Sequence, residues 1–456
     1  MLTDLMWLMP GKVYPPESEK KRLDTYRQNE RLFMSEHAEA LREYFHAIAN
    51  KTRKKKFEVE TVINYQQLLS KKTADFVCGE PPVIETEGSL DRLAAMLKAQ
   101  RWDTHLYEGF IDVSRFGNAV LKIVDRRVTA VSPLYWFPIV DVSDVKAVRQ
   151  HVIAYPVSPD DKGTPRQLYA EIHNAGSVEI RLYEYDGDTG KIGALAQAAA
   201  TAATGLDGFA VVTLTNVTHS GSLYGVDDYN IVNSIIAKII WRLFCIDNVL
   251  DKHSDPSVSG PQSALSYDER FKTYYLDLGN YFSRNSAEDP EMKYMTWDGN
   301  LTAAYQEIEL LLEQLYTLSE MGQALMVGGG GGEANSGTAL KLRMVAPRIK
   351  AARLANLNDD AVRKLIIMLA RVNGITIAPE SLSLTWRDGL PNDETEQINT
   401  LVTATGGGAV MSLYSALKQL GLSDEVIETE IELIRQDAAA NAPALFSHSV
   451  ADDGEP

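Results

Sequence analysis

Residues 63–84 read INYQQLLSKKTADFVCGEPPVI and carry the signals of a helix followed by an extended segment. Asn64 is a good N-cap, because its side chain can accept a hydrogen bond from a free amide of the first helical turn. Gly79 ends the helix, and the double proline at 81–82 prevents it from resuming. We therefore expect an amphipathic helix that ends at Cys78 and a strand directly after the prolines.

The residues before this stretch predict one more helix. Polar and apolar residues alternate at helical spacing from Ser18, a possible N-cap, to Ala49. Its expected core contacts are Leu32, Phe33, Leu41, Tyr44 and Phe45. The basic run KTRKKK at 51–56 follows, and it is either a solvated turn or a contact with DNA or with an acidic neighbouring subunit.

The residues after the stretch predict a helix and then an antiparallel β region. Residues 90–100 form the helix, with Ser89 placed to cap it, and strand-like alternation occupies 104–218. A hairpin turn is expected at 186–190, and the small-residue tract 194–205 is expected to be an exposed connection. The clearest strands are 119–124, 149–155, 177–185 and 209–214.

A long apolar helix is predicted at 226–252, and it carries two adjoining stripes. It is either the core helix of a globule or a helix held between two neighbours in a ring. A small β-containing module (253–299) with strands near 272–278 and 292–297 separates it from a second, acidic helix at 303–326. The first stripe is Ile231, Ile235, Ile239, Leu243, Ile246 and Leu250, and the second is Val232, Ile236, Ile240 and Phe244.

A glycine-rich segment follows the second helix: Gly328, Gly329, Gly330, Gly331, Gly332, Glu333, Ala334 and Asn335. We expect a mobile loop, because consecutive glycines do not hold one backbone conformation.

A basic helix from Thr338 to Arg371 comes next, with a kink expected at Pro347. A strand is expected at 382–386. Residues 391–456 are mostly helical and acidic, with a net charge of −10 and a frayed end from 438.

Composition narrows the function. The 456 residues carry a net charge of −17, whereas a protein that grips duplex DNA over a broad surface is usually basic. An acidic wall instead lets DNA slide without sticking, although charge alone also serves solubility. The only two cysteines, Cys78 and Cys245, are expected to be buried and reduced. We expect no metal site, no signal peptide and no membrane span.

Two segments resemble catalytic motifs but lack the residues that the motifs require. The glycine run lacks the Gly-Lys-Ser/Thr of a phosphate loop, and the helix after it opens with Ser336-Gly337-Thr338. The segment GSLYG at 221–225 has its serine in the wrong position for a nucleophile elbow. We therefore assign no catalytic residue and no cofactor, and a motor ATPase is excluded.

Three segments, in order along the chain, resemble the portal proteins of tailed bacteriophages. They are the helix–Gly–Pro-Pro stretch 63–84, the segment SGTALKLR at 336–343, and the acidic helical end 391–436. The resemblance implies an α+β portal fold that assembles as a ring, usually of about twelve subunits, at one vertex of the capsid. It also implies a virion protein, assembled in the host cytoplasm, that is not an enzyme.

The resemblance divides the chain into seven parts. They are a wing (1–225), a stem helix (226–253), a clip (254–300), a second stem helix (301–326), a tunnel loop (327–337), a long helix with the wing return (338–390), and a crown with the C-terminal tail (391–456). Residues 328–335 would then contact DNA in the channel. The inter-subunit stem residues would be Ile235, Ile239, Ile240 and Leu243.

The partners that the resemblance implies are copies of the chain itself, double-stranded DNA bound without sequence specificity, terminase, a head–tail adaptor, and the major capsid and scaffolding proteins. Two other classes stay open. One is a cytosolic enzyme with an unrecognised site, and the other is another structural ring such as a head–tail adaptor. Adaptors are shorter and lack the helix–clip–helix insertion.

Overall fold

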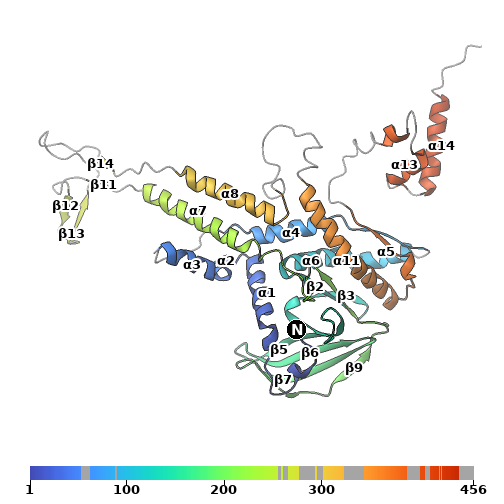
Figure 1. Ribbon diagram of the computed structural model, residues 1–456, viewed down its shortest axis with the longest axis horizontal. Helices are drawn as coiled ribbons and strands as arrows, with labels where there is room; N and C mark the ends of the chain where they lie inside the picture. Colours follow the sequence, from blue (N-terminus) through green and yellow to red (C-terminus); the bar gives the residue numbers. More distant parts are fainter. Residues whose placement is uncertain are drawn as a thin grey trace, which may run out of the picture. The chain divides into compact units, whose positions relative to one another are not determined.

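The computed structural model describes residues 1–52, 62–87, 90–254, 258–259, 265–276, 293–294, 301–322, 344–387, 401–405, 411–420, 422 and 424–440. The chain forms two compact units, Met1–Gly389 and Leu390–Pro456. Helices and strands are both abundant in the first unit (Figure 1), so the predicted α+β class is confirmed.

The N-terminal segment forms several helices instead of the single predicted one. Short 3-10 helices at Met6–Leu8 and Glu17–Glu19 precede them, and Ser18 lies inside the second of these instead of capping a helix. The break between α1 and α2 is at Ser35, whose φ of 70° is incompatible with a right-handed helix. Leu32, Leu41 and Phe45 are buried as predicted, whereas Phe33 and Tyr44 are half-buried. The helices are α1 (Lys20–Phe33), α2 (His37–Ala40) and α3 (Arg42–Thr52).

Asn64 links this break to the predicted helix, which is α4 (Tyr65–Cys78). Its Oδ1 accepts a hydrogen bond from the Gln67 amide at 2.8 Å, so it is the predicted N-cap. Its Nδ2 donates to the carbonyls of Leu32 and Phe33 at 2.9 and 3.1 Å. One side chain therefore satisfies the free amides at the start of α4 and the free carbonyls at the end of α1.

The predicted strand after the double proline is β1 (Val83–Glu85). It pairs antiparallel with β15 (Ser383–Thr385), which confirms the strand predicted at 382–386. Neither cysteine forms a disulfide. Cys78 is buried at the end of α4 as predicted, whereas Cys245 is only half-buried.

Residues 104–116 are helical, so the prediction that the β region begins at 104 is wrong. After α5 (Leu90–Ala99) the chain forms α6 (Trp102–Phe116). Gly117, with φ 79°, ends α6 and donates its amide to the Val113 carbonyl. The buried side chains of α6 recur at helical spacing, namely Trp102, Leu106, Phe110 and Val113.

Two antiparallel sheets follow, as expected for this region. The smaller sheet has the order β10-β2-β3, and the larger has the order β4-β5-β6-β7-β8, with β9 also paired to β7. The four predicted strands are confirmed as β2, β5, β7 and β10, and the predicted turn at 186–190 joins β7 to β8. The tract 194–205 is largely exposed as expected, but it includes β9. The bounds are β2 Asn118–Val124, β3 Arg127–Val131, β4 Trp136–Val140, β5 Val148–Pro159, β6 Pro165–Asn174, β7 Ser177–Asp186, β8 Lys191–Leu195, β9 Ala200–Ala203 and β10 Val211–Thr215, with a 3-10 helix at Pro133–Tyr135.

The two sheets are joined by a buried polar cluster around Glu171 of β6. Lys122 of β2 donates its ammonium to both Glu171 oxygens at 2.7 Å, and His173 Nε2 lies 3.0 Å from one of them. Burial opposes ionisation of Glu171, but the hydrogen bonds from His173 and Lys122 outweigh it and lower its pKa to about 2. The carboxylate is therefore charged at neutral pH and holds the Lys122 ammonium.

Glu171→Gln is expected to destabilise the sheet region in a pH-dependent way. The carboxyl pKa falls from 4.5 to about 2 on folding, which corresponds to about 3 kcal/mol of stability at pH 7. That contribution is present above pH 4.5 and is lost as the pH falls toward 2. Urea unfolding followed by tryptophan fluorescence should show a deficit in the variant at pH 7 that shrinks through this window. Glu179→Gln, which removes the more exposed pair with Arg181, should change stability by about 1 kcal/mol or less.

The long apolar helix is α7 (Asn233–Ser254), which begins later than the predicted residue 226. The second helix, α8 (Thr302–Leu318), ends before the predicted residue 326. Positive φ angles at Glu320 (59°) and Gly322 (67°) turn the chain after α8. The two strands expected between these helices are confirmed as β13 and β14, each with a partner that was not predicted. The pairs are β11 (Val258–Ser259) with β14 (Lys293–Tyr294), and β12 (Leu265–Asp268) with β13 (Thr273–Leu276).

The long basic helix is α11 (Val345–Val372), and it is followed by a 3-10 helix at Pro379–Ser381. Pro347 lies in the first turn of the described helix. Its missing N–H costs no helical hydrogen bond there, so no kink is needed within Val345–Val372. The predicted residues 338–343 lie outside the described part of the chain.

The second unit is helical where it is described, as predicted. Residues 401–405 are helical, and α13 (Leu413–Gln419) and α14 (Asp424–Ala440) follow. Ala416 and Ile427 are buried between them. The predicted frayed end is helical up to 440, and 441–456 lie outside the described residues.

Candidate functional site

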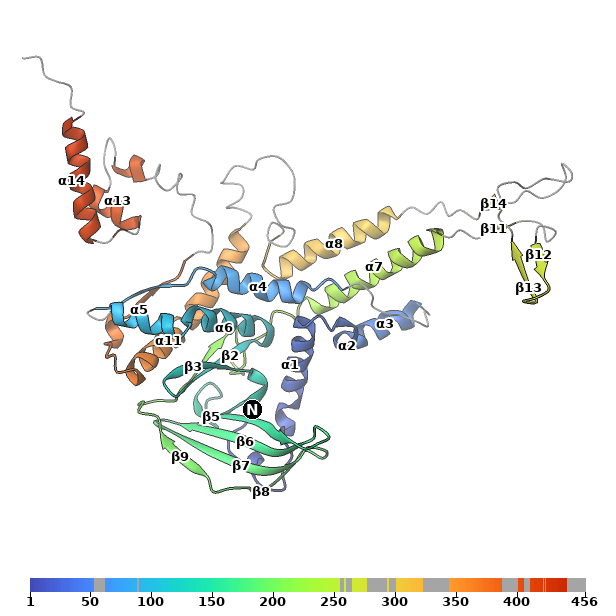
Figure 2. The same ribbon diagram turned by 180° about the vertical axis from the view of Figure 1, so that it is seen from behind.

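The candidate site is the pair of helices α7 and α8, together with the chain segments that join their ends to the rest of the first unit. The two helices run side by side in opposite directions, as two opposite views show (Figure 1; Figure 2). The Glu307 carboxylate of α8 forms ion pairs with two residues one turn apart on α7. The distances are 3.7 Å to Lys238 Nζ and 2.6 Å to Arg242 Nε. These contacts set the register of the pair.

The predicted inter-subunit residues of α7 are mostly buried within the chain itself. Ile239 and Ile240 are only 1% and 2% exposed, and both belong to a core formed with α1, α2, α3, α4 and α8. Ile235 and Leu243 are half-buried and pack against the same core. These four residues therefore serve the fold of one chain first, and of the four only Ile235 and Leu243 have surface left for a second subunit.

Other apolar side chains of this region are open to a partner. The first and last residues of the predicted first stripe are exposed. Ile231 lies just before α7, and Leu250 lies near its C-terminal end. On α8, Tyr305, Leu310 and Leu318 are exposed as well. Such apolar surface is typical of contact sites when it is contiguous. The exposed fractions are 52% for Ile231, 50% for Leu250, 49% for Tyr305, 56% for Leu310 and 39% for Leu318.

Buried polar side chains fix the start of α7. Gln66 of α4 donates to Asn233 Oδ1 at 3.0 Å and accepts from His37 Nε2 at 2.9 Å. Ser70 of α4 lies 2.8 Å from the Tyr229 hydroxyl. Burial lowers the pKa of His37, so its neutral form makes this contact at neutral pH. Since each of these groups is buried, a displaced α7 would leave several polar atoms unpaired.

Two side chains of α11 contact the turn after α8 and fix its position. Lys350 donates to the Ser319 carbonyl at 3.3 Å, and Arg353 forms an ion pair with Glu320. Met321 is buried in the core described above. The glycine-rich residues 328–335, the predicted DNA-contacting loop, lie outside the described residues. The contacts described above do join the turn that precedes the segment containing them, 323–343, to the helix α11 that follows it.

A further charged residue meets Lys350 at this place. Asp228, just before α7, lies 2.9 Å from the Lys350 ammonium, and both side chains are nearly buried. This pair was not predicted, because the sequence pattern indicated only a basic helix from Thr338 to Arg371. One signal was present, because Lys350 lies on the same helical face as Pro347, Ala351 and Leu354, which are all buried.

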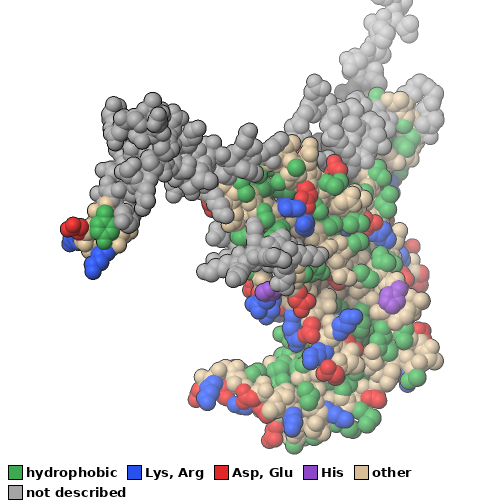
Figure 3. Space-filling view, turned by 60° about the vertical axis from the view of Figure 1, so that its left-hand side comes forward, with side chains coloured by type: hydrophobic (Ala, Val, Ile, Leu, Met, Phe, Trp, Pro, Cys, Tyr) green, Lys and Arg blue, Asp and Glu red, His purple; other side chains and the backbone are tan. Residues whose placement is uncertain are grey.

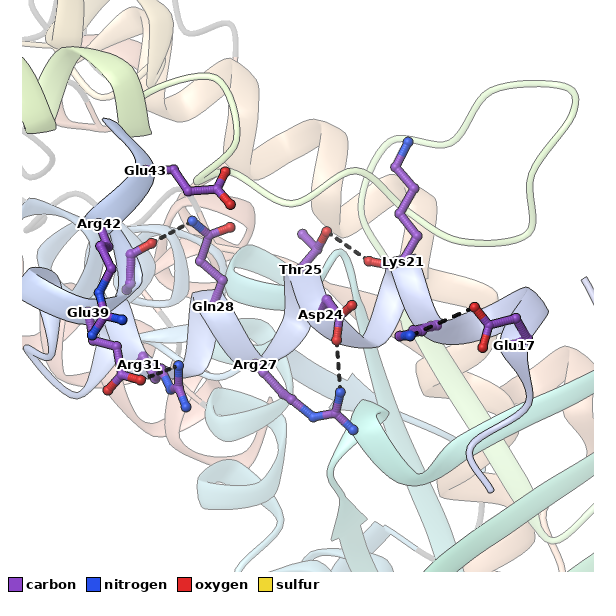
Figure 4. A pocket seen from close by; sticks show the side chains of 12 residues that line it. Glu17, Lys21, Asp24, Thr25, Arg27, Gln28, Arg31, Glu39, Arg42 and Glu43 are labelled. Carbon is purple, nitrogen blue, oxygen red and sulfur yellow. Dashed lines mark hydrogen bonds and ion pairs between the residues drawn. The ribbon is translucent and has the colours of Figure 1, made fainter. Parts of the chain in front are cut away.

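A groove of about 850 Å³ lies beside α1 and the following helices (Figure 4). Charged side chains of both signs line it and pair with one another, such as Arg27 with Asp24 at 3.0 Å and Arg31 with Glu39 at 3.1 Å. Small-molecule sites are usually apolar with a few convergent polar groups. This groove lacks that character, and we assign no ligand to it.

The remaining chemistry of the described residues is sparse. Among them, no three His, Cys, Asp or Glu side chains are grouped so that they could hold a metal ion. No described helix is both long and apolar enough to cross a membrane. On the face drawn in Figure 3, acidic and basic side chains are interspersed with hydrophobic ones, without a broad basic field.

Comparisons with known proteins give a match to a family model and similarities to solved structures. No protein with a curated description matches the sequence. Three similar chains in solved structures come from the virion of a native gene transfer agent (GTA) particle, the neck of an empty GTA particle computed with C6 symmetry, and the neck of a native GTA particle computed with C12 symmetry. They are 12%, 13% and 14% identical, with TM-scores of 0.40, 0.43 and 0.39. The alignments cover 78% of this chain and 88–89% of those chains.

Residues 229–444 match the family model described as "Phage portal protein, SPP1 Gp6-like". The matched range contains α7, α8, α11 and the described helices of the second unit, and therefore the whole candidate site except the residues just before Tyr229. This match confirms the predicted resemblance: residues 229–444 of the chain are similar to the phage portal protein family.

Proposed function

We propose that this chain forms a closed ring at one vertex of a capsid, through which double-stranded DNA is packaged, retained and ejected. The observation that carries the proposal is the family match over residues 229–444. Identical subunits in a ring meet through heterologous contacts that close on themselves. The exposed apolar side chains of α7 and α8 supply surface for such contacts.

The parts of the subunit follow from the family plan. We propose that residues 1–225 are the wing and that α7 and α8 are the two stem helices. Residues 254–300 between them would be the clip, 327–337 the tunnel loop, 338–390 the long helix with the wing return, and 391–456 the crown and tail. The antiparallel pairing of α7 and α8 supports the stem assignment, because a stem must leave the wing and return to it.

The proposed channel would act on DNA through its charge. The chain carries a net charge of −17, and the described helix α8 contains no lysine or arginine and, besides Glu307 that pairs with α7, the acidic residues Glu309 and Glu313. A wall of the same sign as the phosphates does not retain DNA by ion pairing. Contacts in such a channel would be independent of base sequence, as packaging requires.

The partners would be distributed along the same plan. We propose that terminase and then a head–tail adaptor dock on the clip, and that the major capsid and scaffolding proteins contact the wing. The second candidate function is another structural ring of the virion, such as the adaptor itself. The long insertion between α7 and α8 favours the portal, since adaptors are shorter and lack it.

Sizing and negative-stain imaging of the purified chain test the ring. The expected result is a closed ring, usually of about twelve subunits, with an axial channel. A monomer by light scattering at micromolar concentration and low salt would contradict it. A deep pocket with a monomeric chain would favour an enzyme instead.

Leu310→Asp on α8 is expected to prevent ring formation while the chain still folds. Leu310 is 56% exposed, so the change should alter the stability of one chain by about 0.5 kcal/mol or less. A charge placed in an apolar contact costs about 2 kcal/mol or more, and a ring repeats that cost at every interface. Size-exclusion chromatography with light scattering would measure the loss. Val142→Asp, at a side chain 78% exposed in the loop after β4, is the matched control and should assemble normally.

A further inference from the structure

The buried ion pair of Lys350 and Asp228 is the most densely bonded charged group of the candidate site. Lys350 is 3% exposed, and its ammonium lies 2.9 Å from Asp228 Oδ2. Asp228 also accepts from Ser114 Oγ at 2.7 Å, Asn216 Nδ2 at 3.1 Å and Thr73 Oγ1 at 3.4 Å. Its lone pairs are therefore largely occupied by donors from separate elements.

These contacts meet where several segments of the first unit converge. Asp228 precedes α7, Ser319 follows α8, and Lys350 belongs to the beginning of α11. Thr73 and Ser114 lie on α4 and α6, and Asn216 directly follows β10. One ammonium and one carboxylate thus join both proposed stem helices to α11, to two wing helices and to the edge strand of the smaller sheet.

Stability alone does not explain a charged pair at this position. Taking two charges out of water is costly, and well-packed apolar residues of similar volume are often as stabilising. A carboxylate that accepts several directed hydrogen bonds fixes the positions of its donors, because only one arrangement of them satisfies all of the bonds. Apolar packing does not provide this specificity. A shifted α7 or α11 would break several of these bonds at once.

We propose that Lys350 is a positioning residue, whose ion pair with Asp228 fixes the attachment of the α7–α8 pair to α11. The ends of the segment 323–343 then have the same place in every subunit. The inference rests on the proposed portal function for its purpose, because a symmetric channel needs identical placement of that segment around the ring. The neighbouring pair Arg353–Glu320 holds the same turn, whose Glu320 has a left-handed φ of 59°.

The test compares a single and a double variant of the full chain. Lys350→Met leaves the Asp228 carboxylate buried without its cation, so the melting temperature should fall and assembly should fail. Lys350→Met combined with Asp228→Asn removes both charges and should restore most of the melting temperature. Asn keeps an oxygen that can accept from Ser114. The matched control is Arg363→Met with Asp359→Asn, which removes another ion pair of α11 away from this junction.

The deciding measurement is amide hydrogen exchange of Ser319–Gly322 and of residues 228–233. In the double variant we expect exchange at least tenfold faster in both segments, with unchanged exchange in the larger sheet, and a lower yield of infectious particles despite normal ring formation. The control should match the wild type in all of these. Wild-type exchange and yield in the double variant would overturn the proposal, and so would a double variant as unstable as Lys350→Met alone. A wild-type chain that forms no ring would instead contradict the portal function, and the exchange comparison would still test Lys350.

Discussion

Ile239→Asp is expected to unfold the helical part of the first unit, and not only to prevent ring assembly. Ile239 is 1% exposed within a single chain, in the core that α7 shares with α1, α2, α3, α4 and α8. Truncating a buried isoleucine costs about 2–5 kcal/mol, and an unpaired buried carboxylate adds further cost unless it protonates. The loss should therefore exceed about 4 kcal/mol, enough to leave little folded protein.

Circular dichroism and limited proteolysis would measure this loss directly. We expect a markedly lower melting temperature, rapid cleavage in α7 and no rings. Leu250→Asp lies on the same helix at a side chain that is 50% exposed, and it should leave the melting temperature nearly unchanged. Intact rings and a normal melting temperature in Ile239→Asp would show that this core contributes little to the fold.

Replacing Gly329, Gly330 and Gly331 together with alanine is expected to reduce DNA packaging while the ring still assembles. Glycine populates positive φ about as readily as negative φ, and each alanine removes most of those conformations. The added methyl groups are small, and Lys350 and Arg353 hold the turn that precedes the segment. If backbone freedom near the DNA matters for translocation, the yield of filled particles should fall at least tenfold.

Packaged DNA per particle and infectious yield are the measurements for this variant. Gly208→Ala is the matched control, because a Cβ at Gly208 would meet no atom within 4 Å. Normal packaging and normal yield in the triple variant would defeat the proposal that mobility of residues 328–335 matters. Cross-linking of these residues to packaged DNA would test their place in the channel separately.

Local signals accounted for the parts of the fold that were predicted. The helix α4, its N-cap at Asn64 and the strand after the double proline follow from backbone chemistry within a few residues. The strands β2, β5, β7 and β10 follow from alternation over short runs. In each of these cases the neighbouring residues alone determine the conformation.

The errors occurred where distant residues decide. Ser35 breaks the N-terminal helix because Asn64, far along the chain, satisfies the carbonyls that the break leaves free. In α6, the helical spacing of Trp102 and Leu106 competed with aromatic and β-branched residues that favour strands, and packing settled the conflict.

The candidate site was predictable as segments but not as contacts. Periodicity placed Ile239 on an apolar face without showing whether that face meets the same chain or a second one. The pairing of Lys350 with Asp228 joins residues more than a hundred positions apart, and no pattern in one sequence specifies such a meeting. The family resemblance predicted which segment faces a channel, and the contacts between α11 and the turn before that segment came only from the structure.

The pairing of β1 with β15 has a consequence for how the chain is made. Val83 pairs with Thr385, which is 302 residues later in the sequence (385 − 83). At about 5–20 residues per second, a ribosome needs about 15–60 s to add those residues. During that time the nascent chain carries β1 without its partner. The strand is only three residues long and directly follows two prolines, features that make an open strand edge a poor template for aggregation. Val83–Glu85 can therefore stay unpaired during synthesis without promoting aggregation. The first unit can finish folding only after Ser383–Thr385, near its own end, has been synthesised.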